Sequence, residues 1–117
     1  EQDPELAETL EAFVGRFCRL QDTIGDKLLL AWLKAVQEKP GAFVDNLDKA
    51  EKLGLLTSSD QWLVLRHNRN KMIHEYIEDL TQLVDAVQIA FEGIDMMESF
   101  AENLIKDLVQ RFGLKED

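Results

Sequence analysis

The sequence contains only two prolines and six glycines in 117 residues, so few positions would interrupt a helix. Its one cysteine, Cys18, has no partner for an internal disulfide and fits a buried thiol in a cytoplasmic protein. No apolar run approaches the roughly 20 residues that a membrane-spanning helix needs, so no membrane association is expected. No N-terminal signal peptide is visible, although the sequence begins at Glu1 instead of Met, which leaves its natural start unknown.

The sequence also lacks the common signatures of metal and cofactor sites. No Cys, His and carboxylate cluster has metal-ligand spacing, and no glycine-rich phosphate loop is present, so neither a metal nor a cofactor is expected. The formal net charge is −10, which argues against a general nucleic-acid-binding surface but leaves room for a local site. The acidic remainder of the chain would suit a basic protein partner.

The length predicts a single domain that spans residues 1–117. Pro4 at a first helical position, a Ser58–Gln61 capping box, and glycines at 54 and 113 mark helix ends. These signals predict helices at about residues 4–38, 42–53, 58–79 and 81–112.

The two longest segments carry apolar residues in steps of mostly three and four, and no segment alternates with the period of a strand. The first stripe is Leu6, Leu10, Phe13, Phe17, Leu20, Ile24, Leu28, Ala31 and Ala35. The last is Leu83, Val87, Ala90, Ile94, Met97, Ala101, Leu104, Leu108 and Phe112. The pattern predicts an all-α fold, an antiparallel four- to five-helix bundle, with both tryptophans in its core.

Polar residues gather in the third predicted helix, where Arg69, Asn70, His74 and Tyr76 fall within eight residues. Arg66 and Lys71 complete a short basic segment without an intervening carboxylate. Arginine can hold a phosphate through two parallel hydrogen bonds at any pH, and histidine can transfer a proton near neutrality. The segment therefore suits phosphate chemistry, with Arg66 and Lys71 as further contacts to a phosphate backbone such as that of RNA.

This run resembles the R-x4-H-x-Y signature of the HEPN domains, and more narrowly of the HepT-type toxins. The resemblance implies a helical HEPN-type bundle and a metal-independent endoribonuclease that leaves 2′,3′-cyclic phosphates. It also implies a homodimer, and a cognate nucleotidyltransferase antitoxin that adenylylates Tyr76. In this interpretation Arg69 would hold the scissile phosphate, His74 would act as general acid and base, and Asn70 would orient either group.

The spacing within the motif raises a geometric problem. Arg69 and His74 are five residues apart, so they point about 140° apart around a straight helix. Either the helix distorts, or a second chain completes the site across a two-fold axis. We therefore expect a homodimer with the third helices near the axis.

Plainer interpretations stay open. Arg69 could pair with a neighbouring acid, His74 could be a structural histidine, and Tyr76 could be a packing residue with a bonded hydroxyl. His67 has no motif support and is expected at the surface. A second class of function is a non-catalytic subunit that binds a nucleotide or a separate nucleotidyltransferase.

Overall fold

The computed structural model describes residues 4–74 and 80–113, and every element in this part of the chain is helical. The elements in chain order are α1 (Pro4–Asp22), a π-helical segment η1 (Thr23–Leu28), α2 (Leu29–Ala35), α3 (Phe43–Lys52), α4 (Ser59–His74) and α5 (Leu80–Phe112). The predicted all-helical bundle is therefore confirmed. The last five residues predicted for the third helix, 75–79, lie outside the described residues.

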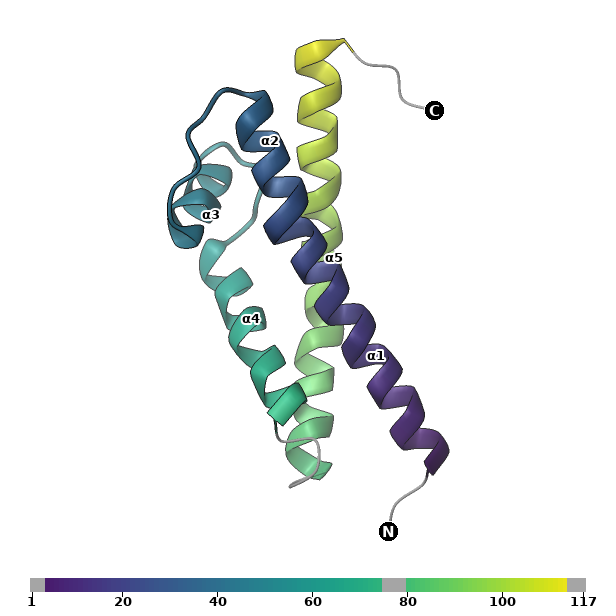
Figure 1. Ribbon diagram of the computed structural model, residues 1–117. Coiled ribbons are helices and arrows are strands. Elements are labelled where there is room, and N and C mark those ends of the chain that lie inside the picture. Colours follow the sequence, from purple (N-terminus) through teal and green to yellow (C-terminus); the bar gives the residue numbers. More distant parts are fainter. Residues whose placement is uncertain (1–3, 75–79, 114–117) are drawn as a thin grey trace.

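Three long rods and one short helix make up the bundle (Figure 1). The first rod is continuous through α1, η1 and α2, and it crosses α5, the longest helix. Helix α4 runs antiparallel to α5 and packs against it, and α4 also contacts α1. The short α3 sits beside the upper end of α4. Helix α4 is therefore held between the other two rods, which fixes the direction of its side chains.

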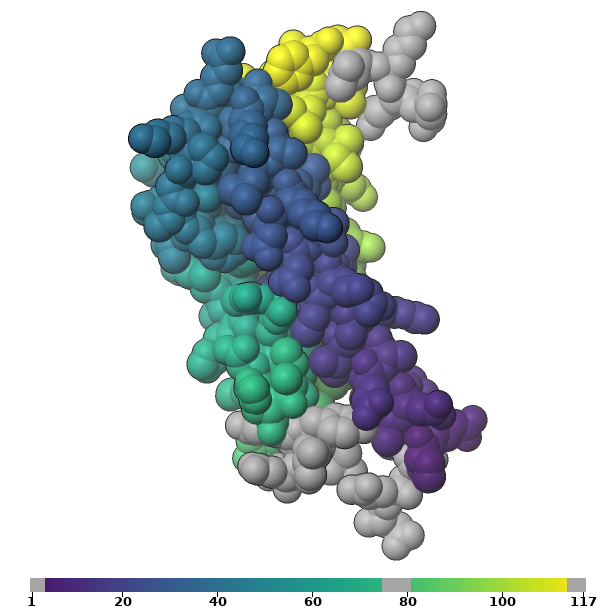
Figure 2. Space-filling view, viewed as in Figure 1, coloured from purple at the N-terminus to yellow at the C-terminus, as the bar shows by residue number. Residues whose placement is uncertain are grey.

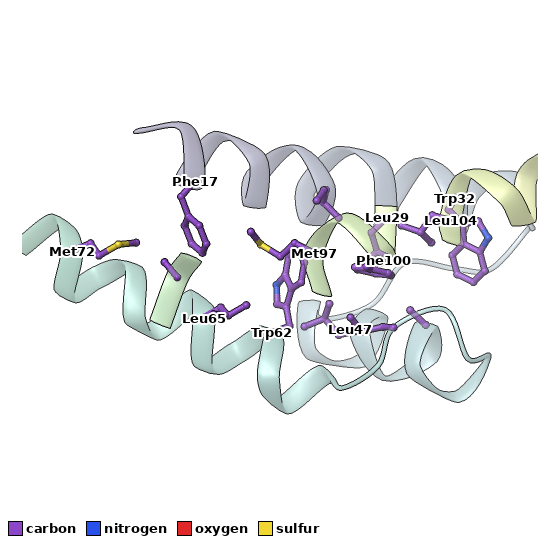
Figure 3. Packing of buried hydrophobic residues seen from close by; sticks show 14 of the residues in the cluster. Phe17, Leu29, Trp32, Leu47, Trp62, Leu65, Met72, Met97, Phe100 and Leu104 are labelled. Atoms are coloured by element: carbon purple, nitrogen blue, oxygen red, sulfur yellow. The ribbon is translucent and has the colours of Figure 1, made fainter. Parts of the chain in front are cut away.

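The core is a single cluster of apolar side chains along the length of the bundle (Figure 3). Trp62 of α4 and Phe100 of α5 meet edge to face, with ring centroids 5.5 Å apart and planes at 83°. Trp32 and Trp62 are both fully buried, as the sequence predicts. Trp32 also donates a hydrogen bond from Nε1 to Asp107 Oδ2 at 2.7 Å, so α2 is tied to α5 by a polar contact as well.

The π-helical segment corrects the predicted apolar stripe of the first rod. A π-turn contains one residue more than an α-turn, so the face that meets the core shifts by about one residue. Before the segment the core side chains are Phe17 and Gln21, inside it Ile24 is buried, and after it the core side chains are Leu29, Trp32 and Leu33. The predicted stripe instead continued through Leu28, Ala31 and Ala35, and Ala31 is exposed in the structure.

Other helix ends follow the predicted signals closely. The backbone N–H of Gln61 donates to Ser58 Oγ at 3.0 Å, which caps α4. Gly54 and Gly113 follow α3 and α5 with positive φ values of 77° and 63°. The first rod ends at Ala35, three residues before the predicted end, and Gln37 takes a left-handed conformation with φ 63°.

A few expected core residues lie near the surface. Leu6 and Phe112 are 47% and 53% exposed, and they lie in the first turn of α1 and the last turn of α5. Cys18 is only partly buried. None of these differences alters the arrangement of α1, α4 and α5 around the candidate site.

Helices α4 and α5 approach each other closely at Gly93. A Cβ atom at this position would lie 2.5 Å from Leu65 Cδ2, well inside the distance that real contacts allow. Glycine is therefore required here so that the side chain of Leu65 can pack directly on the backbone of α5.

Candidate functional site

The two arginines of the motif segment, Arg66 and Arg69, lie on the side of α4 that faces α1. Arg66, Arg69, Asn70 and Ile73 are spaced by three, one and three residues, so they form one stripe along α4. His74 lies at the end of the helix, five residues after Arg69, and points about 140° away from it around the axis. Figure 2 shows this lower half of α4 lying directly beside α1. Arg66 and Arg69 therefore lie at the junction between these two helices, whereas His74 points away from Arg69.

Asp22, the last residue of α1, binds both arginines of the stripe. Its Oδ1 lies 2.6 Å from Arg69 Nη1 and 3.2 Å from Arg66 Nη1, and its Oδ2 lies 3.3 Å from Arg69 Nη2. Arg69 is the more enclosed partner, with 13% of its side chain exposed against 47% for Arg66. The plainer interpretation, in which Arg69 pairs with a neighbouring acid, is therefore confirmed by the contact with Asp22.

The contact with Asp22 uses only one end of the Arg69 guanidinium. The carboxylate faces Nη1 and Nη2, and Nη1 also lies 3.4 Å from Gln21 Oε1 and 3.5 Å from the Cys18 carbonyl oxygen. Arginine carries five N–H donors. The Nε–H donates no hydrogen bond to any described residue, so the edge formed by Nε and Nη2 is the one left for a bidentate ligand.

The ion pair shifts the pKa values of both partners. The hydrogen bond from Arg69 is the main reason that the pKa of Asp22 lies below its ordinary value. Partial burial opposes this shift, while the positive charges of Arg69 and Arg66 add to it. The same hydrogen bond raises the pKa of Arg69, so its positive charge is permanent. Asp22 therefore stays ionised and holds Arg69 in one orientation at neutral pH.

The other predicted site residues do not all lie beside the Arg69–Asp22 ion pair. Asn70 and His74 are exposed, so both are accessible to a ligand or to a second chain. Lys71 points to the other side of α4, where it lines a separate small cavity with Asn68 and Asp85. The predicted basic segment is therefore split between two faces, and Arg66 alone shares a face with Arg69. Tyr76 lies outside the described residues. His67 is exposed, as predicted.

Sequence reasoning missed Asp22 and its neighbour Gln21. A signal for Gln21 was present, because position 21 lies four residues after Phe17 and three before Ile24 and so belongs to the core register. The polar side chain at a core position indicated a buried polar contact. Asp22 carried no such signal, since its pairing with α4 depends on how the two helices cross.

In residues 4–74 and 80–113, no three His, Cys, Asp or Glu side chains are grouped so that they could hold a metal ion. No helix in that part of the chain is both long enough and apolar enough to cross a membrane.

Comparisons with known proteins do not assign this chain to a family. The chain matches no model of a protein family, no curated protein and no solved structure.

Proposed function

We propose that this protein is a metal-independent endoribonuclease with a HEPN-type bundle, in which Arg69 binds the scissile phosphate and His74 transfers the proton. The observation that carries the proposal is the state of Arg69. Asp22 accepts hydrogen bonds from Nη1 and Nη2 at one end of the guanidinium. On the edge formed by Nε and Nη2, the Nε–H donates to no described residue. An arginine fixed in this way is already oriented for a phosphate, so little freedom is lost when the phosphate binds.

Exposed His74 supplies the acid–base function. It would take the proton from the ribose 2′-hydroxyl, whose oxygen attacks the phosphorus, and would return a proton to the departing 5′-oxygen. The products are a 2′,3′-cyclic phosphate and a free 5′-hydroxyl. Asn70, exposed on the same stripe, would orient the phosphate or the imidazole. Arg66 would contact a neighbouring phosphate.

The direction of the side chains supports a homodimeric site. Arg69 faces α1, whereas His74 is exposed at the end of α4. A second copy across a two-fold axis would bring the His74 of one chain toward the Arg69 of the other. Exposed Ile73, which lies between them on the stripe, provides apolar surface for such a contact.

Regulation by a cognate nucleotidyltransferase antitoxin belongs to the same proposal and is supported by the motif at Tyr76. An adenylyl group on that hydroxyl would add a phosphate, which would compete with RNA for the donors of Arg69.

One observation favours the second candidate, a non-catalytic subunit that binds a nucleotide or a nucleotidyltransferase. Asp22 already pairs with both arginines of the stripe, so a phosphate has to compete with a carboxylate for them. A subunit of this kind would bind its partner without cutting RNA, and its expression would not be toxic.

The experiment is RNA cleavage by the purified chain with EDTA present. Arg69→Lys keeps the positive charge but loses the bidentate edge, and His74→Ala removes the acid–base group. Each variant is expected to lose at least 100-fold of the cleavage rate, about 2.7 kcal/mol of barrier. His67→Ala, a histidine exposed on the same helix, is the matched control and should retain most activity. A requirement for Mg²⁺, or full activity of His74→Ala, would exclude the proposed mechanism.

A further inference from the structure

Helix α5, which runs along the whole bundle (Figure 1), carries a column of exposed side chains at positions 84, 91, 98, 105 and 112. Four of the five are large and apolar, namely Val84, Phe91, Ile105 and Phe112, and their exposed fractions are 51%, 64%, 44% and 53%. Seven residues make almost two turns, so the column drifts by only about 20° at each step and stays on one side of α5. Its length is about 42 Å at 1.5 Å per residue.

A second row of apolar residues lies beside the column. Three positions after the first four column positions come Val87, Ile94, Ala101 and Leu108, which are partly buried and pack against the core. The two rows together alternate in steps of three and four, which is the spacing of a coiled-coil seam. Single exposed apolar residues are ordinary, but a column with this period is a surface on which another helix can pack.

Negative charge accompanies the column. Between residues 80 and 105, α5 carries five acidic residues and no basic one. Glu98 occupies the middle position of the column, and Glu102 borders it one turn further on. All five acids are exposed, and none forms an ion pair within the described part of the chain. The charge and the apolar column together match a helix whose apolar stripe is bordered by Lys or Arg.

A second copy of this chain fits the column poorly. Position 98 lies midway between 84 and 112, so two α5 helices that pair over the full column bring their Glu98 side chains together. This holds for parallel and for antiparallel pairing. The neighbouring acids would also meet acids, because no base lies between residues 80 and 105. Like charges that face each other suppress association, so the column favours a partner of opposite charge.

We infer that the exposed column of α5 is the docking surface for a basic amphipathic helix of a partner protein. The partner helix has about four heptads, to match the distance from Val84 to Phe112. Its apolar residues pack along the column, and a lysine or arginine near its middle pairs with Glu98. The column belongs to α5 alone, whereas the ion pair of Asp22 and Arg69 joins α1 to α4, so this inference does not rest on the proposed ribonuclease function.

The test is the binding of synthetic peptides of about 28 residues to the full chain, measured by fluorescence anisotropy. The basic peptide has Leu at its a and d positions and Lys at its e and g positions, with one further Lys at its central a position. A scrambled peptide of the same composition keeps the charge but loses the apolar stripe, and an acidic peptide has Glu in place of every Lys. We expect the basic peptide to bind at least tenfold more tightly than either.

Two variants locate the site. Phe91→Ser removes the most exposed ring of the column and should weaken binding of the basic peptide at least tenfold. Val64→Ser, at an apolar residue of α4 that is 58% exposed, is the matched control and should bind as the wild type does. Glu98→Lys should also weaken binding, and a peptide with Glu in place of its central Lys should restore it. Because position 98 is the middle of the column, this exchange works for either direction of the peptide.

A preference for the basic peptide that Phe91→Ser removes and the exchange at Glu98 restores would support the docking surface. Equal binding of the basic and scrambled peptides would show attraction by net charge alone and would exclude it. Equal affinity of the wild type and Phe91→Ser would exclude it as well. If light scattering shows that Phe91→Ser halves the mass of a wild-type dimer, the column holds a second copy, and the basic partner is excluded. The three substituted side chains are exposed, so the variants are expected to fold.

Discussion

Among single residues, Asp22 joins the two arginines of the candidate site, because one carboxylate binds two guanidinium groups. The contact is partly exposed, so its contribution to stability is modest. Its contribution to orientation is larger, since without it Arg69 would lose the partner that fixes the direction of its Nε edge. Asp22 is therefore best described as a positioning residue for Arg69.

Replacement of Asp22 by Asn is expected to lower RNA cleavage by about 10- to 100-fold, because the neutral amide no longer fixes the guanidinium. Cleavage measured with saturating RNA would show this loss in kcat. Asp95→Asn is the matched control and should cleave at the wild-type rate. An Asp22→Asn variant that cleaves faster than the wild type would show instead that Asp22 inhibits Arg69 by competition.

The pH dependence of stability provides an independent prediction for the same residue. The pKa of Asp22 is lower in the folded protein than in the unfolded chain, so its ion pairs stabilise the fold fully above the unfolded value of about 3.9. That contribution is lost as the pH falls below about 4, through the folded pKa. Urea unfolding between pH 5 and pH 3 should therefore show a steeper loss for the wild type than for Asp22→Asn. Parallel curves would contradict this assignment.

Asp107 also titrates with a lowered pKa, because burial acts to raise it but hydrogen bonds from Trp32 and Arg111 together outweigh that effect. Since Asp107 is present in both the wild type and Asp22→Asn, its contribution to the pH dependence cancels in the comparison.

At the scale of elements, the two helical glycines Gly93 and Gly15 differ in how much space surrounds them. At Gly93 the side chain of Leu65 packs against the backbone of α5. A Cβ atom at Gly15 of α1 would contact only the flexible end of Arg19, at 3.4 Å. The same Gly→Ala substitution should therefore have opposite effects at the two positions. An added methyl group overpacks the first contact, while it favours helix formation at the second.

Gly93→Ala is expected to lower the free energy of unfolding by about 1–3 kcal/mol, because Leu65 or the backbone of α5 has to move. Gly15→Ala should raise it by about 0.5–1 kcal/mol. Urea denaturation at neutral pH measures both. Equal changes in the two variants would show that α4 and α5 do not approach each other as closely as described.

The elements also show what the sequence could predict. The capping residues at Ser58 and Gly54 act locally, so the end of α3 and the start of α4 followed from the sequence. The π-helical segment did not, because a shift of one residue is selected by packing on both sides of Thr23–Leu28. The same distinction between local and packing-dependent features applies to the candidate site. The residues of α4 followed from the motif, but their partner Asp22 depends on the crossing of two helices.

At the scale of the whole molecule, the net charge of −10 requires that any RNA site be local. The two arginines on the α1 side of α4 are neutralised in part by Asp22, so one chain offers little positive surface. A two-fold dimer would double the cations in one cleft and would bring His74 of one chain toward Arg69 of the other.

Light scattering at micromolar concentration should therefore give the mass of two chains. Ile73→Asp places a charge on the proposed contact and should shift the protein to the mass of one chain, with loss of cleavage. Val44→Asp, at an apolar residue on α3 that is similarly exposed, is the control and should stay dimeric. A wild-type protein with the mass of a single chain would exclude the shared site.

Control by a partner enzyme can be tested on the same assembly. Co-expression with a cognate nucleotidyltransferase should add nucleotide mass to the wild type and silence its cleavage. Tyr76→Phe should stay unmodified and active, because the ring remains and only the hydroxyl is lost. Intact-mass spectra with an equal adduct on both proteins would place the modification elsewhere.

The contrast between the two buried indoles gives the molecule an optical property. Trp32 donates to Asp107, whereas Trp62 lines a cavity beside α1. A Trp32→Phe variant would leave Trp62 as the sole source of tryptophan fluorescence. Its emission would then report on the packing of the core around it, without an attached dye. Exposure of that indole during unfolding could be followed on the millisecond timescale in a stopped-flow instrument.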